Sequence, residues 1–412
     1  MPRMDLALLR RLTTGEGWGL LQSLPPYDEK EALALQDRLR GVGFDADLVA
    51  AALNQSRLRA RAADKFGEFA QGMVFTSDGL EQATRLDVAA RHAQRFRQAG
   101  ISTVHDLGCG IGADAMAMAG LDLRVRAIDA DEVTAAIAAV NLRHWPDSTA
   151  VQGRVEEFVP PAGEGARGVG AWLDPARRTP GVADVHGRTR RLFGLGAMTP
   201  SWEQVQEVAR ALPATGVKLA PAFPHHALPA GAEAQWTSLA GEVLECAVWF
   251  GPLVRTPGRT AALLRPGTAP VVVTESDAPE HERVASLGAV GSWLYEPDKA
   301  VLRAGLVGAV AAAVDGCELD EGVGYVSADR AEDVPFARRF VVVEAMPFNV
   351  KALRGWLRDH GFDRLTVKKR GVSVDADLLR RQLRLPAKGS SEATVVLTRV
   401  RSNQVALIVR PA

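Results

Sequence analysis

The sequence predicts an α/β protein in which a helical domain precedes a parallel sheet and a smaller α+β module follows it. Three observations lead to this fold class. Apolar residues follow a helical period before residue 98, short apolar strands alternate with helical stretches from 101 to 265, and strands and helices mix again near the C-terminus. Alternation of strand and helix is typical of βαβ units and so of a parallel sheet. The predicted divisions are 1–97, 98–265, a connecting region at 266–325, and 326–412.

The first division, 1–97, carries helical signals and no strand signal. Apolar residues recur at roughly helical spacing in the stretches 29–39, 45–62 and 78–96. Asp28 precedes the first stretch and is a suitable N-cap, because its carboxylate can accept hydrogen bonds from the first amides of a helix. We therefore expect an N-terminal helical domain that leads into a glycine-rich loop.

The second division, 98–265, alternates between strands and helices. The expected strands are 103–107, 124–128, 149–152, 170–173, 216–219, 241–250 and 260–264. Helices are expected at 131–144 and 201–211, whereas the Arg-rich stretch between 174 and 198 has no regular pattern. These elements predict a Rossmann-like sheet of seven strands.

The remaining residues predict a separate α+β module behind the connecting region. The connecting region has a strand pattern at 271–274 and an alanine-rich, buried helix at 302–314. The module's expected strands are 339–345, 364–368, 394–400 and 405–409, and its expected helices are 349–360 and 375–383. Strands and helices within so short a segment indicate their own small core.

Charge separates this module from the rest of the chain. From Arg338 to the end there are sixteen Lys or Arg and six Asp or Glu, which gives a local net charge of +10. The whole chain has 49 of each kind, so the remainder carries about −10. A basic module on an acidic body is typical of polyanion binding. A solvated basic face without a partner is the alternative.

Composition excludes several classes of protein. Hydrophobic residues at 47% and charged residues at 24% are ordinary for a globular protein. Three scattered cysteines without a CxxC pair argue against a disulfide framework or a zinc site. The charged N-terminus does not resemble a signal peptide, and no apolar run is long enough to span a bilayer. We expect a cytoplasmic protein with no membrane segment, no bound metal and no obligate protein partner.

The segment 104–112 carries most of the functional information. A strand pattern reaches Asp106, and three glycines then alternate with other residues before an alanine-rich helix. Such a strand, turn and helix start lets the backbone approach a nucleotide-like ligand. Asp106 would repel a pyrophosphate but suits a cationic ligand. Asp129, about 20 residues further on at the end of the next strand, can accept hydrogen bonds from ribose hydroxyls; capping the helix at 131 is its alternative role.

The pattern Asp106-x-Gly108-x-Gly110-x-Gly112 resembles the first motif of class I methyltransferases that depend on S-adenosylmethionine (SAM), a cofactor that bears a sulfonium and an ammonium. In that family an acid after the third strand usually meets the adenine, but Arg154 stands there in this chain. The cofactor-binding residues that the resemblance implies are Asp106, Gly108, Gly110, Gly112 and Asp129, with Val155 and Glu156 as the nearest candidates for the adenine contact.

Asp174 and Pro175 end the fourth predicted strand, at the edge where open α/β sheets bind their ligands. They resemble the start of the Asn/Asp-Pro-Pro-aromatic motif of methyltransferases that modify amino groups, although Ala176 and Arg177 replace its second half. The resemblance implies that Asp174, Pro175 and Arg177 form the catalytic site and that Asp174 orients an acceptor amine. A cysteine nucleophile, as in uridine C5 methyltransferases, is not expected, because Cys246 lies in an apolar strand pattern.

Over most of its length the chain resembles a bacterial family of class I methyltransferases with a THUMP-like C-terminal domain. The resemblance rests on 75–85, the Asp106 loop, 174–178 and the basic sequence 368–371. True THUMP domains bind the acceptor end of tRNA, so the resemblance implies an RNA substrate. Together with the motif at Asp174 and Pro175, it implies N-methylation of a base in structured RNA, either tRNA or rRNA. The candidate substrate-binding residues are Phe75, Arg178, Lys218, Lys368, Lys369, Arg370, Arg380 and Arg381.

Other interpretations stay open at this point. Phe75 is equally typical of a core aromatic, and the arginines after Asp174 are also typical of a solvated loop. The function itself has two alternatives. One is a SAM-dependent methyltransferase of a protein or a small molecule, and the other is a non-catalytic RNA-binding protein that retains a vestigial methyltransferase fold.

Overall fold

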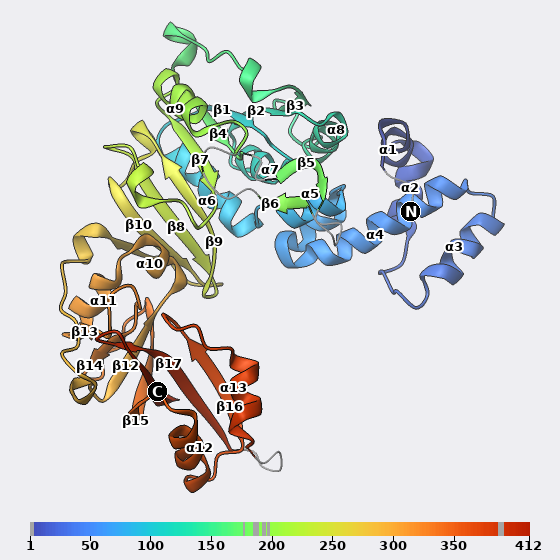
Figure 1. Cartoon of the computed structure of the whole chain (residues 1–412). Helices are drawn as coiled ribbons and strands as arrows, with labels where there is room; N and C mark the ends of the chain where they lie inside the picture. Colours follow the sequence, from blue (N-terminus) through green and yellow to red (C-terminus); the bar gives the residue numbers. More distant parts are fainter. Residues whose placement is uncertain (1–3, 176–177, 184–188, 192–194, 196–197, 386–390) are drawn as a thin grey trace. The chain divides into compact units, whose positions relative to one another are not determined.

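The computed structural model describes residues 4–175, 178–183, 189–191, 195, 198–385 and 391–412, with the backbone alone at 178–183 and 189–191. The chain divides into two compact units, and most of their helices and strands are labelled in Figure 1. The first unit is Met1–Leu219 with Val248–Arg255, and the second is Ala220–Ala247 with Thr256–Ala412. This division groups the chain differently from the four predicted segments, whose bounds remain predictions. No described helix combines the length and apolar character needed to cross a membrane.

The first unit begins with helices, as the sequence predicts. They are α1 (Leu6–Thr13), α2 (Gly15–Ser23), α3 (Ala32–Gly41), α4 (Ala46–Phe66), the 3-10 turn η1 (Gly67–Gly72), α5 (Ser77–Gln82) and α6 (Leu86–Gln98). The single helix predicted at 78–96 is wrong, because it is interrupted after α5. There the Lys65 ammonium donates hydrogen bonds to the carbonyls of Leu80, Glu81 and Ala83 at 2.7–2.9 Å and so ends α5.

Among the described residues of the first unit, five parallel strands pair in the order β3-β2-β1-β4-β7. The strands are β1 (Thr103–Leu107), β2 (Arg124–Asp129), β3 (Thr149–Gln152), β4 (Val169–Leu173) and β7 (Thr215–Leu219). The helices between them are α7 (Ala113–Gly120), α8 (Glu132–Asn141) and α9 (Trp202–Ala211), and a hairpin of β5 (Arg178–Ala183) and β6 (Thr189–Arg191) precedes α9. Since all five strands are parallel, their carboxyl ends share one edge of the sheet.

The α/β class is confirmed, but the predicted total of seven strands is not. The next strands along the chain are β8 (Glu233–Leu239), β9 (Glu242–Trp249), β10 (Gly258–Leu264) and β11 (Val271–Thr274), in the order β9-β8-β10-β11. Strand β8 has no counterpart among the predicted strands, because polar residues interrupt its apolar pattern. Cys246 is fully buried in β9, as predicted, and burial raises the pKa of its thiol.

A second sheet builds the C-terminal part, in the order β13-β14-β12-β15-β18-β17-β16. Its strands are β12 (Trp293–Pro297), β13 (Cys317–Glu318), β14 (Val326–Ala328), β15 (Ala337–Pro347), β16 (Arg364–Lys369), β17 (Glu392–Val400) and β18 (Asn403–Pro411). The helices are α10 (Lys299–Ala304), α11 (Val307–Val314), α12 (Val350–Asp359) and α13 (Ala376–Leu383). The helix predicted at 302–314 is split by Gly305, whose φ is +69°.

Helices α12 and α13 cover one face of this second sheet (Figure 1) and bury Leu353, Leu357 and Leu379 against it. The α+β character of the module is thus confirmed. The predicted connecting region contributes β12, which pairs with β15 in the same sheet. Buried Leu294 of β12 belongs to the core on the sheet's other face.

Close packing at Gly216 of β7 gives a test of the fold. A Cβ atom there would lie 2.6 Å from Cζ3 of Trp249 and 2.9 Å from Cε3 of Trp172, both fully buried. We expect Gly216→Ala to lower the free energy of unfolding by about 1–3 kcal/mol through overpacking. The control is Gly19→Ala in α2, where no atom lies within 4 Å of the added methyl and where alanine favours the helix by about 0.5–1 kcal/mol. Urea denaturation of both variants measures the difference, and equal effects would contradict the packing.

Candidate active site

The glycine loop after β1 has the backbone conformation that its residues predict. Gly108, Gly110 and Gly112 have φ angles of +92°, +55° and +84°, in the left-handed region where residues with a Cβ are strained. A Cβ at Gly108 would lie 3.1 Å from the carbonyl oxygen of Asp174, and one at Gly112 would lie 3.3 Å from Cβ of Ala138. The loop therefore brings bare backbone against the end of β4 and the side of α8.

Asp129 at the end of β2 holds this loop from the neighbouring strand. Its carboxylate accepts hydrogen bonds from the backbone amides of Gly110 at 3.0 Å and Asp131 at 2.9 Å. Burial raises its pKa despite these hydrogen bonds. The capping of α8 falls to Asp131, whose carboxylate accepts from the amide of Thr134 at 2.8 Å. Asp129 is thus next to the glycine loop and is not the helix cap.

Asp106 lies at the same edge with its carboxyl group entirely buried. Neither of its carboxylate oxygens has a hydrogen-bond partner among the described residues. Burial raises its pKa well above the usual range, and the charges of Asp114 and Asp174 raise it further, whereas Lys218 opposes them. A buried, unpartnered carboxyl is costly unless a ligand supplies a partner.

Asp174 and Lys218 come together from the ends of β4 and β7. The Lys218 ammonium forms a short ion pair with the Asp174 carboxylate and donates a second hydrogen bond to the Thr84 hydroxyl at 2.9 Å. The Lys218 side chain is 6% exposed and that of Asp174 is 28% exposed. Lys218 was predicted as a substrate contact, but in the structure it is a buried partner of Asp174.

Residues that the sequence did not single out continue this contact into the interior. The Thr84 hydroxyl donates to Asp114 Oδ2 at 2.7 Å, and His92 Nδ1 lies 2.8 Å from Asp114 Oδ1. Burial raises the pKa of Asp114, but the hydrogen bond and charge of His92, the charge of Lys218 and the hydrogen bond from Thr84 together outweigh it, so the pKa lies below the ordinary value. Asp114, in the first turn of α7, and His92, in the amphipathic α6, carry no sequence signal that distinguishes them from capping or core residues.

Phe75 lies in the core of the first unit. Its ring is 1% exposed and lies 5.8 Å from that of Phe66. Its backbone amide and carbonyl pair with the side chain of Gln55 at 2.9 and 2.7 Å. The structure therefore favours the core interpretation that the sequence left open over stacking on a base.

The predicted adenine contacts follow β3 directly. Val155 and Glu156 form the short 3-10 turn η2 (Val155–Glu157), and Glu156 lies 3.5 Å from Arg154. The amide of Gly153 donates to the carbonyl of Asp129 at 3.0 Å, which keeps this turn at the end of β2. The structure thus places Gly153, two residues before this turn, beside Asp129, and the adenine contact itself remains a prediction.

The remaining catalytic candidates lie just beyond Asp174. Pro175 is buried next to it. Arg177 lies outside the described residues, and Arg178 begins β5 with only its backbone described. Their predicted roles therefore remain predictions.

The basic residues of the C-terminal module divide into two groups. Lys368 and Arg370 both pair with Glu296 of β12, at 2.6 and 3.4 Å, and Arg370 also lies over the ring of Tyr325. An acid of another strand thus partly neutralises these two cations, and their predicted phosphate contacts remain predictions. The other candidates are exposed: Lys369, Arg380, which pairs with Asp377 at 2.7 Å, and Arg381.

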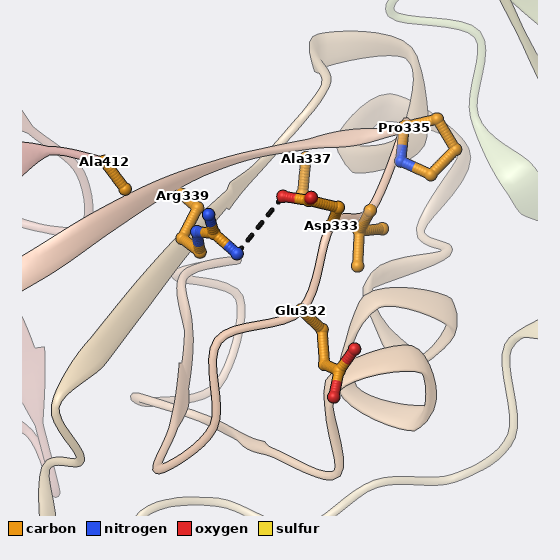
Figure 2. A pocket seen from close by; sticks show the side chains of 7 residues that line it. Glu332, Asp333, Pro335, Ala337, Arg339 and Ala412 are labelled. Atoms are coloured by element: carbon orange, nitrogen blue, oxygen red, sulfur yellow. Dashed lines mark ion pairs between the residues drawn. The ribbon is translucent and has the colours of Figure 1, made fainter.

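One cavity of about 330 Å³ lies in the second unit and not at the glycine loop. Its lining residues are Glu332, Asp333, Val334, Pro335, Ala337, Arg339 and Ala412. Figure 2 shows the ion pair of 3.1 Å between Arg339 and Asp333 in its wall. The wall's charges are thus partly neutralised, and none of the predicted site residues lines it. Among the described residues, no cluster of three or more His, Cys, Asp or Glu side chains is arranged to hold a metal ion.

The buried carboxyl of Asp106 should make the protein less stable as the pH rises. Its folded pKa lies above that of the unfolded chain, so between these values the native state binds a proton that the unfolded state does not. Stability is therefore lost as the pH rises from about 4 towards the folded pKa. We expect Asp106→Asn to raise the free energy of unfolding at pH 7 and to flatten its pH dependence. Asp147→Asn, at an exposed aspartate, is the control. Denaturant titrations from pH 4 to 8 measure the free energy of unfolding, and wild-type values in both variants would contradict the assignment.

Two family models match the chain. A THUMP domain-like model covers residues 337–411, which are the strands and helices from β15 to β18. A domain of unknown function covers residues 5–62, within the N-terminal helices.

The chain is also similar to whole proteins. It is 32% identical over 368 residues to an uncharacterized SAM-dependent methyltransferase of Mycobacterium tuberculosis, found in the strains CDC 1551 and H37Rv, and the match covers 86% of this chain and 95% of the relative. The solved structure of a proposed methyltransferase from Porphyromonas gingivalis W83 superposes with a TM-score of 0.68 and 19% identity, and covers 94% of this chain and all of that one. This second likeness shows the fold.

The residues at the sheet edge fit SAM, the cofactor in the name of the mycobacterial relative. The glycine loop leaves open the backbone that a ligand approaches, and Asp106 offers an unpartnered buried carboxyl to a cationic group. Asp129 supplies a second carboxylate at the end of the adjacent strand. This acidic site, without a described Lys or Arg on the loop itself, suits SAM better than a phosphate-bearing nucleotide. The chain belongs to the family of S-adenosylmethionine-dependent methyltransferases.

Proposed function

We propose that the chain N-methylates a base in structured RNA, either tRNA or rRNA. In this proposal the glycine loop and Asp129 hold SAM, and Asp174 orients the acceptor nitrogen. When bound, SAM supplies a methyl group carried on a sulfonium. The acceptor's lone pair forms the new N–C bond as the C–S bond breaks, the electron pair of that bond stays on sulfur, and the nitrogen's proton leaves to solvent.

The position of Asp174 supports transfer to a nitrogen. Its backbone meets the glycine loop, since its amide donates to the Leu107 carbonyl at 3.3 Å and its own carbonyl faces Gly108. Its carboxylate is partly exposed and is held by Lys218. A fixed carboxylate accepts a hydrogen bond from the acceptor's amino group and so sets the direction of the nitrogen lone pair. Such alignment supplies much of the acceleration in a displacement.

The observation that carries the RNA assignment is the excess of exposed cations on the THUMP-like module. Exposed basic residues described there are Arg338, Lys351, Arg358, Arg364, Lys369, Arg380, Arg381, Arg384, Arg401 and Arg410. The exposed acids described there are fewer: Asp359, Asp375, Asp377 and Glu392. A polyanion with regularly spaced phosphates complements such a surface. A small, uncharged acceptor would leave this excess without a role.

Cofactor binding should depend on Asp129 and not on its neighbour. We expect Asp129→Ala to weaken SAM binding at least about tenfold, or about 1.4 kcal/mol, because both the loop and the ribose lose an acceptor. The control, Asp131→Ala, removes the cap of α8 and should cost about 0.5–2 kcal/mol of stability while SAM affinity stays within a few-fold. Isothermal titration calorimetry measures both. Equal SAM affinities in the two variants would argue against the assigned role.

Methyl transfer to RNA is the direct test of the function. Extract from a strain that lacks the gene is incubated with purified protein and methyl-labelled SAM, and the label is counted in RNA, protein and small-molecule fractions. We expect label in RNA, in a methylated nucleoside that mass spectrometry identifies, and a loss of about a hundredfold or more in Asp174→Ala with SAM affinity nearly unchanged. With three phosphate contacts, binding of the RNA should fall about fortyfold between 50 and 200 mM salt. Label in another fraction would replace the RNA assignment.

A further inference from the structure

The buried chain of hydrogen bonds behind Asp174 has no role in the function proposed so far. It runs from Lys218 through Thr84 and Asp114 to His92. We infer that Thr84, Asp114 and His92 are positioning residues, which act through Lys218 to hold the Asp174 carboxylate in place beside the cofactor. The inference rests on the proposed role of Asp174, but not on RNA as the acceptor.

Each link of this chain comes from a different element of the first unit. Asp174 follows β4, Lys218 lies in β7, Thr84 lies between α5 and α6, Asp114 begins α7, and His92 lies in α6. The sequence separations across the links are 44, 134, 30 and 22 residues. No local turn or helix contact accounts for such links. The network therefore depends on the tertiary fold, which brings these elements together.

Burial distinguishes Asp174 from the residues behind it. The Lys218, Asp114 and His92 side chains are 6%, 8% and 4% exposed, and Thr84 is 7% exposed, against 28% for the Asp174 side chain. The chain therefore opens to solvent at Asp174. Charged groups interact more strongly in such a poorly hydrated setting, and a misplaced partner there is costly.

The hydroxyl group of Thr84 connects Lys218 to Asp114 in this chain of hydrogen bonds. It accepts a hydrogen bond from the Lys218 ammonium and donates one to the Asp114 carboxylate, so both hydroxyl functions are used. Valine has nearly the same shape and can do neither, whereas serine can do both. Replacing Thr84 by valine thus leaves Asp174 and Lys218 intact but removes one of the contacts that fix Lys218.

The inner end of the chain is fixed by packing. The His92 ring lies 4.3 Å from that of Trp172 and 5.8 Å from that of Trp249, which stack on each other at 5.3 Å. All three side chains are buried. Asp114 therefore receives its hydrogen bond from a ring that the aromatic core holds in one place.

The test needs a readout that does not depend on the acceptor. Sinefungin carries an amine where SAM carries its transferable methyl, and S-adenosylhomocysteine carries nothing there. A fixed, ionised Asp174 should favour the ammonium, so the ratio of the two dissociation constants reports its placement. We expect wild type and Thr84→Ser to prefer sinefungin and Thr84→Val to lose about three- to tenfold of that preference, with S-adenosylhomocysteine affinity unchanged. Methyl transfer is then measured on the extract fraction that the wild type labels. We expect kcat to fall about tenfold or more in Thr84→Val and to recover in Thr84→Ser.

A matched control separates this effect from loss of a buried hydroxyl in general. Thr398→Val makes the same change at a fully buried threonine of β17, whose hydroxyl has no partner among the described residues, and should leave the binding ratio unchanged. If Thr84→Val does not fold, as judged by S-adenosylhomocysteine binding, Thr84→Ala replaces it. A wild-type ratio in the Thr84 variant, or an equal loss in the serine variant, would overturn the inference. Label in protein instead of RNA would overturn only the RNA assignment, because the binding ratio is measured without an acceptor.

Discussion

The ion pair between Lys218 and Asp174 is the interaction on which the rest of the active site depends. Parallel strands end at one edge of a sheet, so β1, β2 and β4 bring three aspartates to the same place. Burial disfavours ionised carboxyls, and the pKa values of Asp106 and Asp129 rise accordingly. A buried ammonium from β7 compensates the third carboxylate. Without it, the glycine loop would close over acids that repel one another.

The helical domain contributes to this site through the segment that follows α4. Gln55 of α4 holds the backbone of Phe75, and Asn141 of α8 accepts from the amide of Val74 at 2.8 Å. A Cβ at Gly79 would lie 2.4 Å from Cγ2 of Ile111, so α5 packs directly on the glycine loop. Lys65 then ends α5 just before Thr84. The N-terminal helices thus fix the position of α5, which packs on the glycine loop, and of the Thr84 hydroxyl, which contacts Lys218.

Local patterns allowed the five parallel strands and the glycine loop to be predicted, whereas the network behind Asp174 could not be predicted from them. The strands at 103–107 and 149–152 match their predicted bounds, because short apolar runs end at turn residues. Thr84 falls inside a helix predicted at 78–96, since helical period alone does not reveal a break made by Lys65. His92 looks like any residue of an amphipathic helix, and only the tertiary fold brings it to Asp114.

The basic sequence at 368–371 shows why charge counted along a chain overstates the charge available to a ligand. Alternate residues of a strand point to opposite faces, so Lys368 and Arg370, around the end of β16, share a face and Lys369 has the other. Lys368 and Arg370 both form ion pairs with Glu296, which lies 72 residues before Lys368 in the sequence. Lys369 stays exposed and donates to the carbonyl of Val374 at 2.7 Å. A Lys-Lys-Arg sequence in a strand therefore divides between internal ion pairs and a solvent face, and the ion pairs reduce the charge that a count along the sequence assigns to the surface.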